Sequence, residues 1–231
     1  MSIAENIALV RANIAQACAQ PGRSPEEITL VGASKMNDAA ACREAIAAGI
    51  DALGENRVQE MTAKLAENAY DGAPLHFIGH LQRNKVKPVV GKVALIQSVG
   101  SMELLEEIEK VAAREQLVQD ILLEVNIGRE EAKSGFDPAE VAAAAETALA
   151  RPHVRVRGLM TIPPADADRD TNMRYFQEVQ ALYVDINTKL FHNELKCLSM
   201  GMSGDYMDAI RCGATMVRVG TAIFGARHYN I

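Results

Sequence analysis

Paired cysteines, a basic charge excess and long apolar runs are all missing from this chain of 231 residues. Its few cysteines form no CxxC pair and show no zinc-finger spacing. They are Cys18, Cys42, Cys197 and Cys212. A chain of this length with 48% apolar residues does not need disulfides to stabilise its core. The cysteine usage therefore favours a reducing, cytoplasmic location.

The charge and the apolar pattern exclude two further classes of protein. The formal net charge is −6, whereas a nucleic-acid-binding domain usually carries a strongly basic surface, so we expect no nucleic-acid partner. No segment approaches the roughly 18 uninterrupted apolar residues of a membrane span. The N-terminus also lacks a basic segment before an apolar stretch, so we expect neither secretion nor membrane insertion.

The apolar periodicity that is present predicts alternating strands and helices. Residues Ile3 to Ala19 carry apolar side chains at steps of three and four, which is typical of one preliminary helix. After it, short apolar runs alternate with amphipathic stretches. These runs are Ile28–Ser34, Ala52–Gly54, Leu75–Gly79, Ala94–Val99, Ile121–Ile127, Val156–Ile162, Cys197–Met202 and Met216–Gly220. Most are continuously apolar, as strands of a parallel sheet covered by helices are.

The number of these units decides between two architectures. No linker rich in glycine, serine or proline divides the chain, which predicts a single domain over residues 1–231. Eight strand–helix units in this length predict a single (β/α)8 TIM barrel with an extra N-terminal helix. An open, doubly wound sheet is the alternative fold.

Two helix starts are marked by capping residues. Asp137, Pro138 and Glu140 have the N-cap, N1 and N3 spacing before an alanine-rich run, so we expect a helix to begin there. Either Asn37 or Asp38 is expected to cap an earlier helix.

Two distant segments carry side chains suited to a phosphate-bearing aldehyde. Lys35 ends the first apolar run, where an amine can form a Schiff base once desolvation or a nearby cation favours its neutral form. The last run reads Arg218-Val219-Gly220-Thr221, and phosphates are often held after the last two barrel strands. Pyridoxal phosphate has the aldehyde, the ring nitrogen and the phosphate that these groups would bind. The alternatives are a solvated loop lysine and a structural arginine in a buried strand.

Two further features are open to more than one interpretation. Ser203 precedes a helix expected near Asp205. It would either only cap that helix, or cap it and bind phosphate together with the helix end. His76 and His80 would share one face of a strand, the spacing of a metal pair. No third ligand stands beside them in the sequence, so we predict no metal site.

Several segments spread over nearly the whole chain carry a family pattern. They are Gly54-Glu55-Asn56, His76-Phe77-Ile78-Gly79, Lys133-Ser134-Gly135, Arg157-Gly158-Leu159-Met160, Leu198-Ser199-Met200-Gly201-Met202-Ser203 and Arg218-Val219-Gly220-Thr221-Ala222-Ile223-Phe224-Gly225. With them the chain resembles the pyridoxal-phosphate homeostasis protein family, which is similar to the N-terminal barrel of alanine racemase. The resemblance implies pyridoxal 5′-phosphate bound as a Schiff base on Lys35. It also implies that Arg218 faces the ring nitrogen.

The remaining implied contacts complete the pocket. By the resemblance, Ser203, Gly220 and Thr221 hold the phosphate, while Asn56 and Ser199 line the pocket. Some members of the family end in a lysine-rich stretch that is linked to cofactor exchange. This chain ends Arg227-His228-Tyr229-Asn230-Ile231, so we do not expect that exchange role here.

Three functions remain open at this point. The first is a non-catalytic protein that buffers or delivers pyridoxal phosphate, with apo-enzymes as recipients and a monomer or weak dimer as its state. The second is a fold-type III amino-acid racemase or decarboxylase. Racemisation needs a second acid/base group besides Lys35, from Tyr206, Tyr229 or a second subunit. The third is a Schiff-base aldolase acting on a sugar phosphate.

Overall fold

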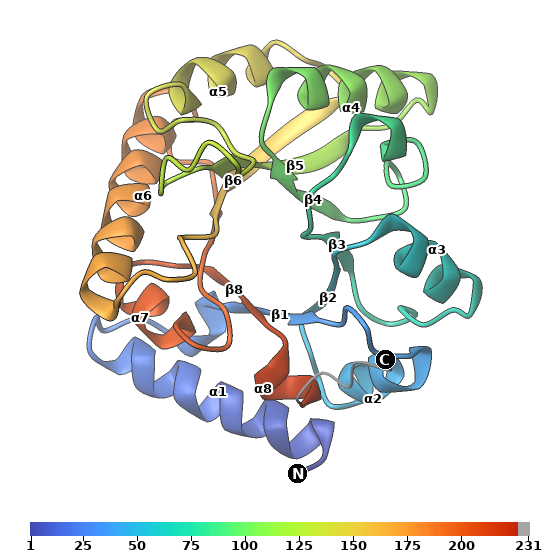
Figure 1. The fold of residues 1–231 in the computed structure, drawn as a ribbon, viewed down its shortest axis with the longest axis vertical. Coiled ribbons are helices and arrows are strands. Elements are labelled where there is room, and N and C mark those ends of the chain that lie inside the picture. The colour runs from blue at the N-terminus through green and yellow to red at the C-terminus, as the bar shows by residue number, and fades with distance from the viewer. Residues whose placement is uncertain (226–231) are drawn as a thin grey trace.

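The computed structural model describes residues 1–225, and its eight strands form a closed parallel barrel in sequence order (Figure 1). The strands are β1 (Thr29–Ala33), β2 (Ala52–Glu55), β3 (Leu75–Phe77), β4 (Leu95–Val99), β5 (Gln119–Val125), β6 (Val154–Thr161), β7 (Cys197–Ser199) and β8 (Met216–Val219). Strand β8 pairs with β1 and closes the barrel. The predicted TIM barrel is confirmed, and the open-sheet alternative is wrong.

Helices surround the barrel on its outside (Figure 1). They are α1 (Ile3–Ala19), α2 (Ala39–Ala47), α3 (Val58–Ala66), α4 (Met102–Arg114), α5 (Val141–Leu149), α6 (Arg169–Lys189), α7 (Tyr206–Arg211) and α8 (Thr221–Phe224), with short 3-10 turns at Pro25–Glu27 and Arg83–Lys85. The predicted preliminary helix is α1 with the expected bounds. A capping box at Ser2 begins it, and it lies beside α7 and α8. No helix in this part of the chain combines the length and apolarity needed to cross a membrane.

The two helix-capping predictions had different outcomes. Asp38 caps α2, since its side chain accepts a hydrogen bond from the Ala41 backbone N–H at 2.8 Å. The prediction that Asp137 caps α5 is wrong, because α5 begins later, at Val141. Asp137 instead accepts from the Ala139 N–H at 2.9 Å and stabilises a separate turn before the helix. An N-cap and a separate turn both use the aspartate side chain as acceptor for a nearby backbone N–H. The sequence pattern therefore does not distinguish the two arrangements.

The barrel interior is filled by inward-facing side chains in layers. One buried cluster consists of Val31, Ala52, Leu95, Leu122, Met160 and Met216, one residue from each of six strands. Because side chains alternate along a strand, the residue two positions further on faces the same interior. That next layer contains Gln97, Glu124, Ser199 and Arg218, so the interior becomes polar toward the carboxyl ends of the strands.

Candidate functional site

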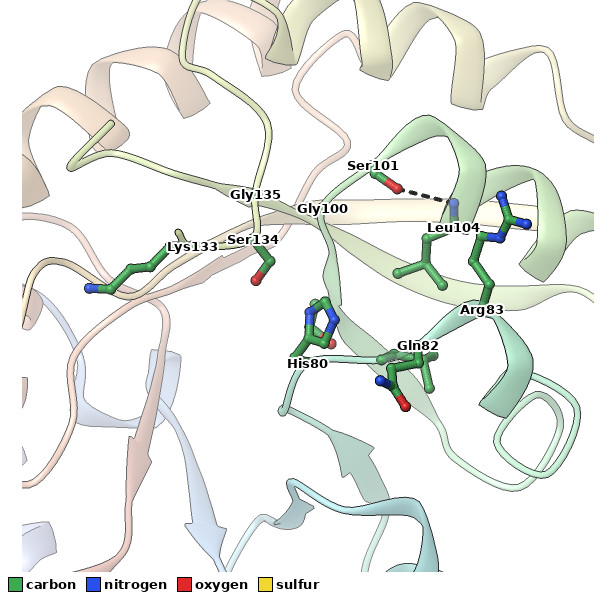
Figure 2. Close-up of a pocket in the computed structure, with 11 residues that line it drawn as sticks. His80, Gln82, Arg83, Gly100, Ser101, Leu104, Lys133, Ser134 and Gly135 are labelled. Atoms are coloured by element: carbon green, nitrogen blue, oxygen red, sulfur yellow. Dashed lines mark hydrogen bonds between the residues drawn. The ribbon is translucent and has the colours of Figure 1, made fainter. Parts of the chain in front are cut away.

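Loops that follow the strands line two of the cavities at the polar end of the barrel. The larger one, of about 740 Å³, lies over the loops after β6 and β7 and is lined by Pro163, Met202 and Gly204 among others. The smaller one measures about 290 Å³, and Figure 2 shows His80 and Ser134 from different loops around the same opening. Lys35 lines neither of these two cavities. The end of β1, two residues before it, determines where its backbone lies.

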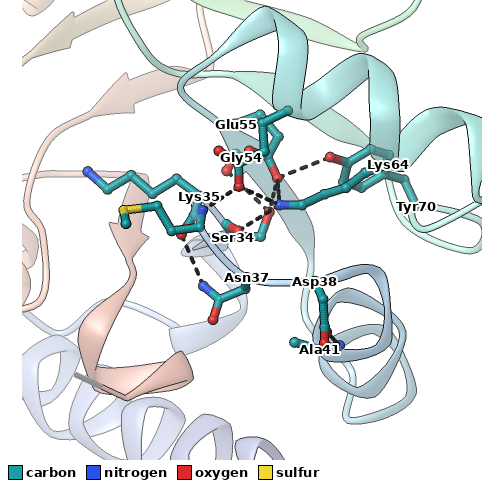
Figure 3. Close-up of polar contacts among 11 residues, drawn as sticks. Ser34, Lys35, Asn37, Asp38, Ala41, Gly54, Glu55, Lys64 and Tyr70 are labelled. Carbon is teal, nitrogen blue, oxygen red and sulfur yellow. Dashed lines mark hydrogen bonds and ion pairs between the residues drawn. The ribbon is translucent and has the colours of Figure 1, made fainter. Parts of the chain in front are cut away.

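Lys35 follows β1 on the side of the barrel interior. It lies in the turn that follows this strand, two residues after Ala33 and four after the inward-facing Val31. Its side chain is partly buried. Figure 3 shows it extending away from Ser34 and Lys64. The amine is therefore carried by the turn at the carboxyl end of β1, at the mouth of the barrel.

The last strand brings the predicted phosphate segment to the same place. In the β1–β8 pair, Val31 stands opposite Arg218 and the next residues continue in register. The Gly220 backbone lies against the end of β1, since a Cβ built on it would stand 3.4 Å from the Ala33 carbonyl oxygen. Lys35 and Gly220 thus leave two neighbouring strands at the same end of the barrel.

Two backbone donors at the start of α8 converge on one oxygen atom. The N–H groups of Gly220 and Ala222 both donate to the hydroxyl of Ser203, at 3.1 and 3.3 Å. A pair of N–H groups aimed at a single oxygen is suited to an oxyanion such as a phosphate oxygen. The expectation that Ser203 caps α7 is wrong, because Asp205 is the N-cap of that helix and Ser203 meets α8 instead.

Arg218 is buried inside the barrel, where only 3% of its surface is exposed. Its Nη1 donates to Ser199 Oγ at 2.5 Å and its Nη2 to the Thr161 carbonyl oxygen at 2.9 Å. Burial lowers the pKa of Arg218 to about 10, while the charges of Glu124 and Asp205 act in the opposite direction. The side chain thus remains a cation at neutral pH and is held by β6 and β7.

A chain of buried hydrogen bonds continues from Arg218 across the interior. The Ser199 hydroxyl donates to Gln97 Oε1 at 2.7 Å, and Gln97 Nε2 lies 2.9 Å from His76 Nδ1. Burial lowers the pKa of His76 to about 4. The Nδ1 of a neutral imidazole can accept a hydrogen bond from the Gln97 amide, and this bond orients the amide. The amide in turn orients the Ser199 hydroxyl, which contacts the Arg218 guanidinium. Sequence analysis assigned no role to Gln97, because a single polar residue in an apolar strand has no periodicity to mark it.

This buried histidine predicts an acid sensitivity of the fold. The native pKa of His76 lies below the ordinary value of 6.5, so the unfolded chain binds the proton first and stability falls as the pH drops from 6.5 toward 4. We expect this group to cost about 2 kcal/mol of unfolding free energy between pH 7 and pH 5. Urea unfolding at both pH values measures the loss. His76→Gln should lose less on acidification than the wild type, and equal losses would exclude His76 as the cause.

His76 and His80 do not lie on one face of a strand, as the spacing predicted. Strand β3 ends at Phe77, so His80 lies in the following loop and does not share a strand face with His76. Within residues 1–225 there is no group of three or more histidine, cysteine, aspartate or glutamate side chains arranged to hold a metal ion.

Asn56 presents a buried acceptor at the end of β2. Its Oδ1 is buried and has no hydrogen-bond partner within the described part of the chain. The backbone around it is tightly packed, because a Cβ on Gly79 would stand 2.3 Å from the Asn56 carbonyl oxygen. A buried acceptor without a partner costs free energy, so this atom is a contact point suited to a donor on a ligand.

A cluster of buried polar side chains lies on the other side of β1, between β2 and α3 (Figure 3). Oε1 of Glu55 accepts from Ser34 Oγ at 2.6 Å, Lys64 Nζ at 2.7 Å and the Tyr70 hydroxyl at 3.0 Å. Lys64 also donates to Glu60 Oε1 at 2.9 Å. Sequence analysis did not find this cluster, because Lys64 and Glu60 occupy a helix whose charged residues are ordinarily solvated.

The charges in this cluster support one another. Burial alone lowers the pKa of Lys64, but its hydrogen bonds and ion pairs with Glu55 and Glu60 outweigh this effect and raise the pKa above its ordinary value. Burial, and then the negative charge of Glu55, raise the pKa of Tyr70. At neutral pH the cluster therefore contains a charged lysine and a neutral tyrosine.

The site residues are thus distributed over one end of the barrel. Direct hydrogen bonds join Ser199 to Arg218 and Ser203 to Gly220. The β1–β8 pairing brings the end of β1, which Lys35 follows, to the same end of the barrel as Gly220. Thr221 begins α8. Asn56 follows β2, the other neighbour of β1. The predicted tail, Arg227 to Ile231, lies outside the described residues.

Known proteins share this sequence pattern and fold. The family described as alanine racemase, N-terminal domain, matches residues 6–228. A pyridoxal phosphate homeostasis protein of Aquifex aeolicus (strain VF5) is 41% identical over 229 residues, which cover 99% of this chain and 100% of that protein. The structure of PipY of Synechococcus elongatus PCC7942 with PLP bound is 33% identical, with a TM-score of 0.84, and covers 97% of this chain and 100% of PipY.

A more distant structure shares the fold. Alanine racemase of Clostridium difficile 630 is 18% identical with a TM-score of 0.72, over 98% of this chain and 58% of the racemase. At this identity the likeness concerns the barrel alone. The full-length matches are more specific, and from them this chain belongs to the pyridoxal phosphate homeostasis protein family.

Proposed function

We propose that this protein binds pyridoxal 5′-phosphate in the mouth of its barrel and serves intracellular cofactor homeostasis by buffering or delivery, without catalysis. The cofactor is held as a Schiff base on Lys35, and the whole chain, residues 1–231, is one cofactor-binding domain. The observation that carries the proposal is the pairing of β1 with β8, because it brings the turn that holds Lys35 to the same end of the barrel as the two convergent N–H groups of Gly220 and Ala222.

The donors and acceptors at this junction fit the proposed cofactor. Pyridoxal phosphate supplies an aldehyde, which condenses with an amine to form a C=N bond and release water. Gly220, Thr221 and Ser203 bind the phosphate at the start of α8. A phosphate oxygen there replaces the Ser203 hydroxyl as acceptor of the Gly220 N–H, and that hydroxyl then donates to the phosphate. Arg218 is a cation for the ring nitrogen. Asn56 and Ser199 complete the pocket wall. The PipY structure with PLP bound, which matches 97% of this chain, supports pyridoxal phosphate as the ligand.

The surroundings of Tyr206 support a role without catalysis. A racemase needs a second base that reaches the mouth, and Tyr206 was one candidate from the sequence. Its hydroxyl instead accepts a hydrogen bond from Asn13 of α1 at 2.9 Å, on the outer side of α7.

A titration followed by visible absorption tests the proposal. The purified protein is titrated with pyridoxal phosphate alongside Lys35→Ala and the control Lys92→Ala, which removes an exposed lysine. We expect a band in the wild type and the control that Lys35→Ala lacks. The protein loaded with pyridoxal phosphate should not racemise L- or D-alanine. It should also not catalyse exchange of the α-proton of alanine for deuterium. Racemisation that depends on Lys35 would favour the racemase alternative, and the absence of any band would favour the aldolase.

A further inference from the structure

We propose that the buried ionic cluster of Glu55, Glu60 and Lys64 positions the Lys35 amine, by holding the backbone on both sides of that residue. The inference rests on the proposed function, because it concerns how the amine is presented to an aldehyde. Lys64 and Glu60 would then be positioning residues, since neither touches the ligand.

The contacts of the cluster with the β1 loop are direct. Lys64 Nζ donates to the carbonyl oxygen of Ser34, the residue before Lys35, at 2.9 Å. The backbone N–H of Met36, the residue after Lys35, donates to Glu60 Oε1. Both groups come from α3, so one helix fixes the two peptide units that flank the amine-bearing residue.

The cluster lies on the outer side of the barrel, away from the mouth. Ser34 alternates with Lys35 along the chain, and the Ser34 hydroxyl contacts Glu55 outside the barrel wall. Figure 3 shows the Lys35 side chain extending in the opposite direction from Glu55 and Lys64. A ligand in the mouth is therefore separated from these charges by β1 itself, and their influence has to pass through the backbone.

Stability alone does not account for this arrangement. The side chains of Lys64 and Glu55 are 6% and 0% exposed, and a buried ion pair is often no more stabilising than apolar side chains of the same volume. The second carboxylate oxygen of Glu55 is buried without a hydrogen-bond partner in residues 1–225, which is a further cost.

The loop that the cluster holds is itself strained. Met36 has φ +64°, a left-handed conformation that costs energy for a residue other than glycine and that persists only where the surroundings impose it. Such held backbones occur where a side chain must be presented in one direction. The hydrogen bond from Met36 to Glu60 provides that restraint, so the cost of the cluster is offset by a defined direction for Lys35.

Variants of Glu60 test the inference, because this residue contacts the loop and is less buried than Lys64. Glu60→Ala removes the acceptor for the Met36 N–H, Glu60→Gln keeps an oxygen there, and Gln59→Ala changes an exposed neighbour on α3. Tyr70→Phe removes a donor to Glu55 that has no contact with the loop. All four are compared for thermal midpoint and for the rate of covalent attachment of pyridoxal phosphate.

The expected result separates positioning from stability. Glu60→Ala should slow covalent attachment by roughly tenfold, while Glu60→Gln and Gln59→Ala stay near the wild-type rate. Tyr70→Phe should lower the thermal midpoint without slowing attachment. Affinity for pyridoxamine 5′-phosphate, which has no aldehyde and reports only non-covalent binding, should be unchanged in all of them.

Other outcomes are equally informative. The inference is overturned if Glu60→Ala attaches the cofactor at the wild-type rate, or if Tyr70→Phe slows attachment by the same factor as Glu60→Ala. A wild-type protein that binds neither pyridoxal phosphate nor pyridoxamine phosphate would overturn the proposed function itself and this inference with it.

Discussion

Lys64→Met is expected to destabilise the protein by about 3–5 kcal/mol, because it leaves a buried carboxylate without its cation. Glu55 is fully buried, and Lys64 is 2.7 Å from its Oε1. Methionine is similar to lysine in length and fits the apolar part of the space, so the lost charge dominates the effect. Urea unfolding at pH 7 measures the change, and the wild-type slope of free energy against urea should be retained.

A second variant shows whether charge or packing causes the loss. The double variant Glu55→Gln with Lys64→Met removes both buried charges, so it should recover most of the stability that Lys64→Met loses. If the double variant is as unstable as the single one, packing of the lysine stem is the cause and the electrostatic explanation is wrong.

At alkaline pH, the buried Lys64 determines how the stability of the wild type changes. The native pKa of Lys64 is raised above its ordinary value of 10.5. The stabilisation from this group is therefore complete below that value and lost as the pH rises through the native pKa. It makes no contribution to the acid loss attributed to His76, and the two effects occur at opposite ends of the pH scale.

The architecture was predictable because its signal is repeated many times along the chain. Each strand core is an apolar run, and eight such runs separated by helix-length segments define the barrel even where single strand ends differ. The run Leu75–Gly79, for example, contains a strand only over Leu75–Phe77. Of its last residues, Ile78 still donates its N–H to the Glu55 carbonyl oxygen at 2.9 Å. Gly79 packs against the backbone of Asn56, a contact between segments that local sequence does not encode.

The site was predictable only in part, for a related reason. Lys35 and Arg218 end two apolar runs, and that position marks them in the sequence. Gln97 and Lys64 contact residues that are distant in the sequence. Gln97 binds Ser199, 102 positions away, and Lys64 binds Ser34, 30 positions away. Their roles arise from barrel closure and helix packing, which bring together groups that no spacing in the sequence relates.

Gly158→Ala is expected to cost about 3 kcal/mol or more, because the strand pairing leaves no space for a side chain. Gly158 pairs with Cys197 between β6 and β7, and a Cβ on it would stand 1.6 Å from the Cys197 carbonyl oxygen. Its φ of +155° also disfavours an L side chain. Since a backbone atom causes the clash, the two strands have to separate.

That separation should also reach the binding site, because β6 and β7 carry both acceptors of Arg218. The Thr161 carbonyl oxygen lies on β6 and the Ser199 hydroxyl on β7, so moving the strands apart misplaces the guanidinium. Urea unfolding measures the stability, and pyridoxamine phosphate affinity of the folded fraction measures the site. Gly204→Ala is the matched control for the stability measurement, because a Cβ there meets no atom within 4 Å. Equal stability of the two variants would show that β6 and β7 accommodate the methyl group, and the packing argument would then be wrong.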